Sequence, residues 1–308
     1  MSDEACPTSP DDSSPDGGSP DDTSAEPHVS PPGLVLVSTP IGNLGDVSIR
    51  ARDILRHSDL ILCEDTRHSA RLLTALGIST RTEPLHEHNE DARIAPILGM
   101  LRAGKRIALI SDAGTPLVSD PGFRLVRAAI AAGFPVTAIP GPNAAVTALV
   151  LSGLPPLPFL FLGFPPPRQA ARRAAFGALR AAERAGLTAT LIWHEAPHRL
   201  PETLTDMAEA FGARPAAVAR ELTKHFEEVR RGTLTGLAEY YTANAARGEI
   251  TILVGPPVDN DAEDLDGSLR SALKDNSVRE AAALVTAATG LPRKLVYARA
   301  LELAKEAG

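Results

Sequence analysis

Three short turns rich in Gly and Pro are the segments of this sequence best suited to hold a small molecule. They lie at 39–43 (TPIGN), 112–116 (DAGTP) and 140–143 (PGPN), each just after a short apolar run. In open α/β sheets, ligands bind beyond the carboxyl ends of the strands, and glycine lets the main chain approach a ligand because it has no Cβ. The turns therefore predict one shared cleft. The sequence contains no GxxxxGK[ST] or GxGxxG motif, so a standard nucleotide-phosphate site is not expected.

Polar residues that could act on a substrate follow the apolar run 60–63. Glu64, Asp65 and Arg67 stand where a strand should give way to a helix, which makes them candidates for catalysis or substrate binding. Asp65 or Thr66 could instead cap that helix, because short polar side chains accept hydrogen bonds from the first helical N–H groups. Capping alone would explain one of the two carboxylates.

The run 86–90 (HEHNE) contains two further candidates. His88 or Asn89 could bind a substrate or move a proton, although Asn89 could equally cap a helix. The two histidines resemble metal ligands, but no further ligand set is evident nearby. We therefore expect no metal.

Charged residues also follow two expected strands in the second half of the chain, at 188–193 and 216–220. They are Glu195, His198, Arg199, Arg220 and Lys224. Both loops should reach the cleft, where Arg and Lys would suit the charged groups of an anionic substrate and the other side chains could contact the same substrate. Arg220 and Glu221 could instead form only an internal ion pair.

These loops require a scaffold of alternating strands and helices. From 33 to 153 the apolar runs predict an N-terminal α/β domain with a mostly parallel sheet. Its strands are expected at 34–38, 60–63, 107–111 and 136–139, and its helices at 48–57, up to 76, 89–103, 122–132 and 143–151. The predicted fold class is therefore α/β.

A Pro-rich stretch near 153–158 predicts a boundary, followed by a second α/β domain over 158–256. Its strands are expected at 159–162, 188–193, 216–220, 227–233 and 249–254, with helices at 172–185, 200–211 and 235–241. Strands that follow one another without helices favour a mixed, more antiparallel sheet. Residues 257–274 are predicted to be an acidic linker, and 275–308 a short helical extension that resembles either a helix-turn-helix pair or a simple helical hairpin.

Composition limits the classes of partner. Eight of the 38 acidic residues lie within 1–32, which contains no Lys or Arg, so the remaining chain has 30 acidic and 31 basic residues and an anionic substrate is not excluded. We expect 1–32 to be a disordered acidic tail, because Ser, Pro, Asp and Gly bury too little surface to order a chain. It lacks the features of a signal peptide, and no run is apolar enough to span a membrane, so a cytoplasmic location is expected.

In this order, the motifs resemble those of the tetrapyrrole methylase superfamily, and within it the enzymes that methylate a cytidine ribose of small-subunit ribosomal RNA. The matching segments are 39–46, 64–68, 86–90, 111–116, 120–122, 140–142, 195–200, 219–224 and 248–250. The resemblance implies a two-domain fold, S-adenosyl-L-methionine as the methyl donor, and a homodimer. It also implies a 16S rRNA or small-subunit substrate that is methylated on a 2'-hydroxyl at the decoding centre.

The resemblance further implies where the donor is held, largely by the main chain of the turns. The corresponding residues are Pro40, Asp112, Ala113, Gly114, Thr115, Val118, Asn143, Ala144, Leu222 and Ile250. Two alternatives stay open. One is a methylase of a small tetrapyrrole such as a precorrin, and the other is an RNA-binding module that uses the fold without turnover.

Overall fold

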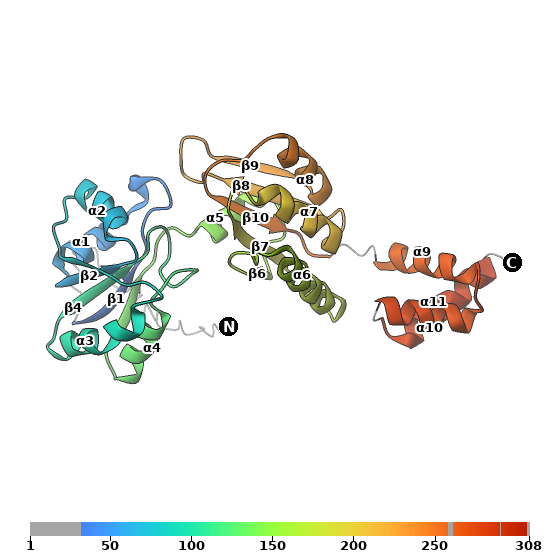
Figure 1. Ribbon diagram of the computed structural model, residues 1–308, viewed down its shortest axis with the longest axis horizontal. Coiled ribbons are helices and arrows are strands. Elements are labelled where there is room, and N and C mark those ends of the chain that lie inside the picture. The colour runs from blue at the N-terminus through green and yellow to red at the C-terminus, as the bar shows by residue number, and fades with distance from the viewer. Residues whose placement is uncertain (1–31, 258–260, 290, 307–308) are drawn as a thin grey trace, which may run out of the picture.

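The computed structural model describes residues 32–257, 261–289 and 291–306 (Figure 1). The predicted disordered tail falls outside this range except for its last residue. Two five-stranded sheets and a separate group of helices follow one another along the chain. Among the described residues, no helix is both long enough and apolar enough to cross a bilayer.

The first sheet is fully parallel, with the strand order β3-β2-β4-β1-β5. Its strands are β1 (Gly33–Val37), β2 (Leu60–Cys63), β3 (Thr82–Pro84), β4 (Arg106–Ile110) and β5 (Val136–Ile139). Every residue of β2 is buried, as expected for a strand covered on both faces. The carboxyl ends of all five strands consequently lie at one edge, and the three Gly/Pro turns lie with them.

Helices cover both faces of this sheet. One face packs against α1 (Ile49–His57) and α2 (Thr66–Ala75), and the other against α3 (Glu90–Arg102) and α4 (Phe123–Ala131). A short 3-10 helix, η1 (Leu44–Asp46), follows the first turn. The side chains of Ser48 and Asp65 cap α1 and α2. This arrangement confirms the predicted α/β class.

The second sheet is mixed, with the order β6-β7-β10-β8-β9. Its strands are β6 (Phe159–Phe161), β7 (Thr190–Glu195), β8 (Pro215–Arg220), β9 (Glu228–Thr233) and β10 (Ile250–Val254). Only β6 and β7 pair in parallel. The helices α6 (Gln169–Arg184), α7 (Leu200–Phe211) and α8 (Leu234–Ala243) cover one face, around a core that includes Phe176, Trp193 and Phe211.

The other face of the second sheet packs against α5 (Ala144–Ser152), which directly follows the third turn of the first sheet. Ala145, Ala148 and Leu149 of this helix share one buried cluster with Ile192 and Leu253 of the second sheet. Figure 1 shows α5 where the two sheets meet. The helix thus fixes the third turn next to the second sheet.

The predicted linker at 257–274 is wrong over most of its length. The structure has a helix there, α9 (Asp261–Leu273), which packs with α10 (Val278–Thr289) and α11 (Arg293–Glu306). Leu265, Leu269 and Leu273 recur every four residues, so they form one apolar stripe that the neighbouring acidic residues obscure in the sequence. This three-helix unit lies apart from the two sheets in Figure 1.

Candidate functional site

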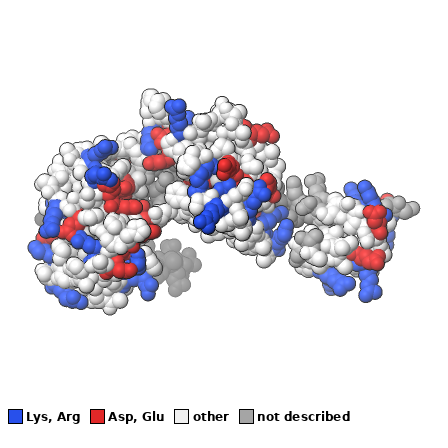
Figure 2. Space-filling model, in the orientation of Figure 1, with Lys and Arg blue, Asp and Glu red and all other residues white. Residues whose placement is uncertain are grey.

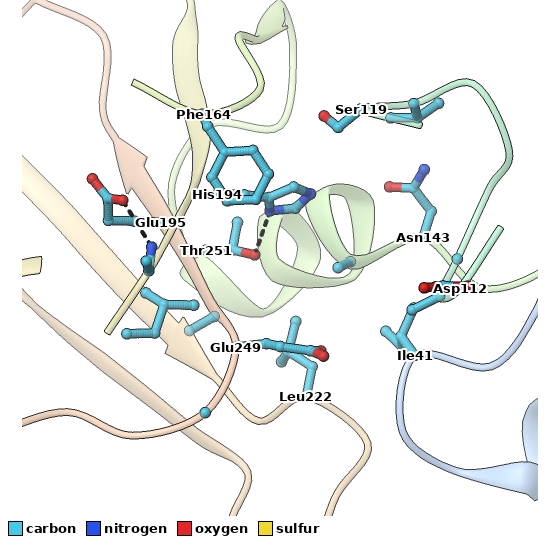
Figure 3. Close-up of a pocket in the computed structure, with 18 of the residues that line it drawn as sticks. Ile41, Asp112, Ser119, Asn143, Phe164, His194, Glu195, Leu222, Glu249 and Thr251 are labelled. Atoms are coloured by element: carbon cyan, nitrogen blue, oxygen red, sulfur yellow. Dashed lines mark hydrogen bonds between the residues drawn. The ribbon is translucent and has the colours of Figure 1, made fainter. Parts of the chain in front are cut away.

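A cavity of about 380 Å³ lies between the two sheets. Figure 3 shows its two walls, with Ile41, Asp112, Ser119 and Asn143 facing Phe164, His194, Leu222 and Glu249. The first wall is formed by loops of the first sheet and comprises Ile41, Asp112, Ala113, Gly114, Thr115, Val118, Ser119, Asp120, Asn143 and Ala144. The second wall comprises Phe164, His194, Glu195, Ala196, Pro197, Ala219, Leu222, Gly248, Glu249, Ile250 and Thr251.

The three Gly/Pro turns are tied to one another in the first wall. Thr39 and Gly114 exchange two main-chain hydrogen bonds, with N···O distances of 2.9 and 3.1 Å. The Thr115 hydroxyl donates to the Pro142 carbonyl at 3.2 Å, and the Asn143 amide donates to that hydroxyl at 3.3 Å. The turns therefore form a single surface, as the sequence predicted.

Glycine is required at specific points of this surface. Gly114 has φ +84°, a conformation that other residues rarely adopt. A Cβ at Gly141 would lie 2.8 Å from the Cβ of Ser38, so the third turn could not approach the first strand as closely. Gly114 thus lets the second turn pair with the first, and Gly141 lets the third turn approach Ser38, which directly follows β1.

Nine of the ten residues predicted to contact a donor line this cavity, namely Asp112, Ala113, Gly114, Thr115, Val118, Asn143, Ala144, Leu222 and Ile250. Pro40 instead lines a neighbouring cavity of about 310 Å³, which also includes Ile41, Asp112, Ala113 and Glu249. The geometry thus brings the first two turns together with Leu222 and Ile250, which lie more than 100 residues away in the sequence.

Asp65 and Arg67 do not line the cavity. The Asp65 carboxylate caps α2 by accepting from the Arg67 N–H at 2.8 Å, and it also accepts from the Arg67 guanidinium at 3.0 Å. Hydrogen bonds from the Arg67 side chain and main chain lower the pKa of Asp65 to about 2. The alternative of helix capping, left open for Asp65 in the sequence, is what the structure shows.

Glu64 is the remaining carboxylate of that motif. It does not line the cavity, but burial raises its pKa, and the negative charges of Asp112 and Glu87 raise it further. Glu64 thus belongs to an acidic group at the carboxyl ends of β2 and β4.

Asp120 belongs to the same acidic group and was not singled out as a site residue from the sequence. It lines the cavity. Burial raises the pKa of Asp120 to about 7, with further contributions from the charges of Glu64 and Asp112, while the side chain of Ser111 opposes the shift. Its position in the matched motif 120–122 was the available signal. What the sequence could not show is that the segment folds back onto the cavity.

His88 and Asn89 lie outside the cavity lining. His88 is exposed, whereas the Asn89 side chain accepts from the His86 N–H at 2.9 Å and donates to the Pro84 carbonyl at 3.1 Å. Asn89 makes no side-chain hydrogen bond to the N–H groups of α3, so it braces the preceding loop rather than capping the helix in this way. Among the described residues, no group of three or more His, Cys, Asp or Glu side chains is arranged to hold a metal ion.

Two of the charged residues predicted for the second wall are bound within the protein. Glu195 is buried, and its carboxylate accepts from the Ala196 N–H at 2.7 Å and from the Thr203 hydroxyl at 2.5 Å. Arg199 lies 3.3 Å from Glu195 and donates to the Pro165 carbonyl at 2.7 Å. His198 is exposed and lies outside the cavity lining.

Arg220 and Lys224 are ion-paired as well. Arg220 pairs with Glu228 across β8 and β9 at 2.6 Å, so the Arg220–Glu221 pair considered in the sequence is wrong. Glu221 instead accepts from Lys224 at 2.8 Å, and Lys224 also lies 3.3 Å from Glu249. Lys224 lines the neighbouring cavity.

Sequence reasoning missed an aromatic group in the second wall. The His194 ring lies against Phe161 and Phe164, with centroid distances of 4.9 and 5.7 Å. One ring nitrogen is 3.1 Å from the Thr251 hydroxyl, and the other points into the cavity in Figure 3. Burial lowers the pKa of His194, so its neutral form is favoured. Strand alternation alone could not show which residues of β7 face the first sheet.

Comparisons with known proteins match both the two-sheet part of the chain and the three-helix unit. The family model of tetrapyrrole (corrin/porphyrin) methylases matches residues 33–238, and the model of the RsmI C-terminal HTH domain matches 259–304. Similar solved structures include a conserved hypothetical protein from Aeropyrum pernix K1, with a TM-score of 0.59 at 18% identity, covering 90% of this chain and 98% of that one. A cobalt precorrin-4 methyltransferase has a TM-score of 0.54 at 17% identity, covering 72% and 94%. These likenesses concern the fold.

Curated relatives are much closer in sequence. The ribosomal RNA small subunit methyltransferase I of Xylella fastidiosa strain Temecula1 is 48% identical over 276 residues, covering 87% of this chain and 99% of the relative. The protein of the same name from Micromonospora olivasterospora is 46% identical over 271 residues, covering 86% and 85%. The chain therefore belongs to the tetrapyrrole methylase family, in the group of the ribosomal RNA small subunit methyltransferases I.

Proposed function

We propose that this protein transfers a methyl group from S-adenosylmethionine to the 2'-oxygen of a cytidine ribose at the decoding centre of 16S ribosomal RNA. The observation that carries the proposal is the match of 42–48% identity, over most of the chain, to relatives named ribosomal RNA small subunit methyltransferase I. The cavity between the sheets supports it, because it is enclosed by the residues expected to hold the donor.

The first wall fits a donor that carries a sulfonium. Bound there, S-adenosylmethionine would supply an electrophilic methyl group, and its positive charge disappears on transfer. Main-chain groups at Ala113, Gly114 and Thr115 offer dipoles, Val118 offers apolar contact, and Leu222 offers apolar contact from the second wall. The volume of about 380 Å³ lies within the usual range of ligand pockets.

The chain also offers surfaces for RNA. Figure 2 shows basic side chains on the part of the molecule around each sheet and on the three-helix unit. It shows acidic side chains gathered where the part around the first sheet faces the part around the second. Arg279, Arg293, Lys294 and Lys305 are exposed on the three-helix unit, where they can contact phosphates. Because Arg199, Arg220 and Lys224 are all bound to partners within the protein, we assign phosphate contacts to this unit.

Methylation of ribosomal subunits tests the proposed function directly. Tritiated S-adenosylmethionine and the purified protein should label small subunits that lack the modification. After alkaline hydrolysis the label should remain in an alkali-resistant dinucleotide, because a 2'-O-methyl group blocks cleavage at that position. Large subunits serve as the control.

Two outcomes would separate this function from the alternatives. Label on a porphyrinoid but not on ribosomal RNA would favour a tetrapyrrole methylase. Binding of the donor and the subunit without any transfer would favour an RNA-binding module. The relatives' shared name favours the ribosomal enzyme over both, and the C-terminal unit favours it over a tetrapyrrole methylase.

We also propose a homodimer in the cytoplasm, where ribosomal subunits are assembled. Val146 and Val150 on α5 expose 46% and 70% of their surface, and Leu157 and Phe159 just beyond the helix expose 77% and 39%. These side chains lie close together in the sequence, and we take them as the proposed dimer surface. Light scattering should report twice the chain mass, and Val150→Asp should shift the protein towards monomer.

A further inference from the structure

The proposed transfer needs a group that removes the proton of the ribose hydroxyl. Among the described residues, five acidic or histidine side chains line the cavity: Asp112, Asp120, His194, Glu195 and Glu249. An effective base for work near neutral pH has a pKa near that pH and an atom free to accept a proton. The five side chains differ in how well they meet these two requirements.

Three of them have other partners. Glu195 is buried and accepts from Ala196 and Thr203 while pairing with Arg199. Glu249 is 71% exposed at its side chain and pairs with Lys224. The Asp112 carboxylate accepts from the Asp65 N–H at 3.4 Å. Asp120 and His194 remain.

Asp120 is carried by a loop with a tightly determined conformation. Leu117 and Ser119 both have φ +71°, which non-glycine residues rarely adopt and which the surrounding packing must maintain. Gly122 ends the segment, and a Cβ there would lie 2.6 Å from Leu109 and 2.9 Å from Leu117. The loop therefore holds Asp120 at the cavity rather than leaving it free in solvent.

We propose that the Asp120 carboxylate is the general base of the methyl transfer. The 2'-oxygen forms a bond to the methyl carbon while the sulfur–methyl bond breaks and its electron pair returns to sulfur. The hydroxyl proton passes to Asp120, which later releases it to solvent. This assignment rests on the proposed function.

The charges around Asp120 suit this role. Glu64 at the end of β2 and Asp112 at the end of β4 are the carboxylates that act on it, and the side chain of Ser111 acts in the opposite direction. Glu64 is in turn influenced by Asp65, His86 and Glu87. Together with burial, these carboxylates raise the pKa of Asp120 to about 7, so it accepts a proton far more readily than an ordinary aspartate.

His194 is the rival base, because one of its nitrogens points into the cavity. Its ring is held by Phe161, Phe164 and Thr251, and burial lowers its pKa. We assign it to packing against the bound molecules. Asp120 and His194 can be distinguished by experiment, because removal of the base should abolish the pH dependence that its ionisation causes, whereas removal of a packing residue should leave it in place.

The test measures single-turnover methylation of unmodified small subunits from pH 5.5 to 9, with wild type, Asp120→Asn, Asp120→Glu, His194→Gln and the exposed control Glu239→Gln. For the wild type, the logarithm of the rate should rise with unit slope to a plateau above about pH 7. Asp120→Asn should lose about 100-fold or more of the rate, and Asp120→Glu should regain part of it. Glu239→Gln should have the rate of the wild type at every pH. His194→Gln should keep the change from unit slope to plateau at about pH 7.

Calorimetry with S-adenosylmethionine and a thermal melt complete the test. Asp120→Asn should bind the donor within about threefold of wild type, a difference of about 0.6 kcal/mol or less, and should remain folded. Three results for Asp120→Asn would overturn the assignment: loss of donor binding, a rate close to wild type, or an unchanged change of slope near pH 7. The assignment would also be overturned if His194→Gln abolished that change of slope. If the wild type itself labels no ribosomal RNA, the proposed function fails instead, and the assignment falls with it.

Discussion

Two loops on opposite sides of the cavity have the same unusual backbone but opposite electrostatics. In the loop at 115–122, Leu117 and Ser119 have positive φ angles, and in the loop at 220–227, Glu221 and Thr223 do. Glu221 accepts from Lys224 and from the Glu249 N–H at 3.0 Å. Asp120 lies instead among the carboxylates of Glu64 and Asp112.

The pKa shifts of the two carboxylates run in opposite directions. The hydrogen bond from Lys224 lowers the pKa of Glu221, whereas burial and neighbouring carboxylates raise that of Asp120. In the second loop, ion pairs and hydrogen bonds offset the strain of the backbone. In the first loop, the charged groups that act on Asp120 are themselves negative. We infer that the contacts of the second loop stabilise its backbone conformation. The surroundings of the first loop instead adjust the protonation of Asp120.

The largest effect is expected from Glu195→Ala, which asks whether the ion pairs of the second wall are structural. Removing this buried carboxylate leaves the Ala196 N–H and the Thr203 hydroxyl without their acceptor and Arg199 without its ionic partner. The free energy of unfolding should fall by about 3 kcal/mol, as when one partner of a buried pair is lost. Urea denaturation measures it.

Glu249→Ala is the matched control for that change, because Glu249 is in the same wall but its side chain is 71% exposed. It should lower the free energy of unfolding by less than about 1 kcal/mol. Equal effects of the two substitutions would contradict the structural interpretation of the second wall.

Gly114→Val should have the next largest effect, because it changes the conformation of the first wall. Gly114 has φ +84°, and the added side chain would face Ile41 and Pro142. Affinity for S-adenosylmethionine should fall by about 30-fold or more, or about 2 kcal/mol, because the main chain and the cavity both change. Calorimetry measures the loss.

Gly177→Ala tests whether any added methyl group has this effect. Gly177 lies in α6, and a Cβ added there would meet no neighbouring atom within 4 Å. Alanine should therefore keep donor affinity and raise the free energy of unfolding by up to about 1 kcal/mol. Retained donor affinity in Gly114→Val would argue against the first wall as the donor site.

A smaller effect should appear in the pH dependence of stability. The pKa of Asp120 is raised from 3.8 to about 7, so the folded state binds its proton more tightly than the unfolded state. The contribution of Asp120 therefore becomes less favourable as the pH rises from about 4 to 7, and stays at that level above 7. Asp120→Asn should be more stable than wild type above pH 7, by a difference on the order of 1 kcal/mol.

Urea denaturation of both proteins at pH 5 and pH 8 checks this difference. The gap in unfolding free energy between variant and wild type should be larger at pH 8. A gap that narrows as the pH rises would mean that the Asp120 carboxylate is stabilised by a partner, and the contrast between the two loops would disappear.

The smallest effect is expected from Lys224→Ala in the second loop. The ion pairs of Lys224 are partly exposed, so their loss should lower the free energy of unfolding at pH 7 by about 1 kcal/mol or less. Lys224 lowers the pKa of Glu221, so this contribution is present above the ordinary pKa of 4.5 and is lost as the pH falls below it. A loss that grows in acid would contradict the ion pair as its cause.

Much of the fold was predictable because its apolar periodicity is strong. The strands Leu60–Cys63 and Val136–Ile139 and the helix Leu200–Phe211 coincide with the predicted ranges. The strand Thr82–Pro84 was missed because it is short and only partly buried, and α9 was missed because acidic residues surround its apolar stripe.

The sequence by itself determined the three Gly/Pro turns and the strand ends on which they sit, because local chain geometry depends on nearby residues. It therefore predicted most of the first wall. Only the tertiary structure decided which charges are bound in ion pairs and which face the cavity. In the sequence, Glu195, Arg220 and Asp120 are all charged residues that follow an apolar run or a turn, with nothing to distinguish their surroundings. In the structure, burial and neighbours that are distant in the sequence control their partners and protonation.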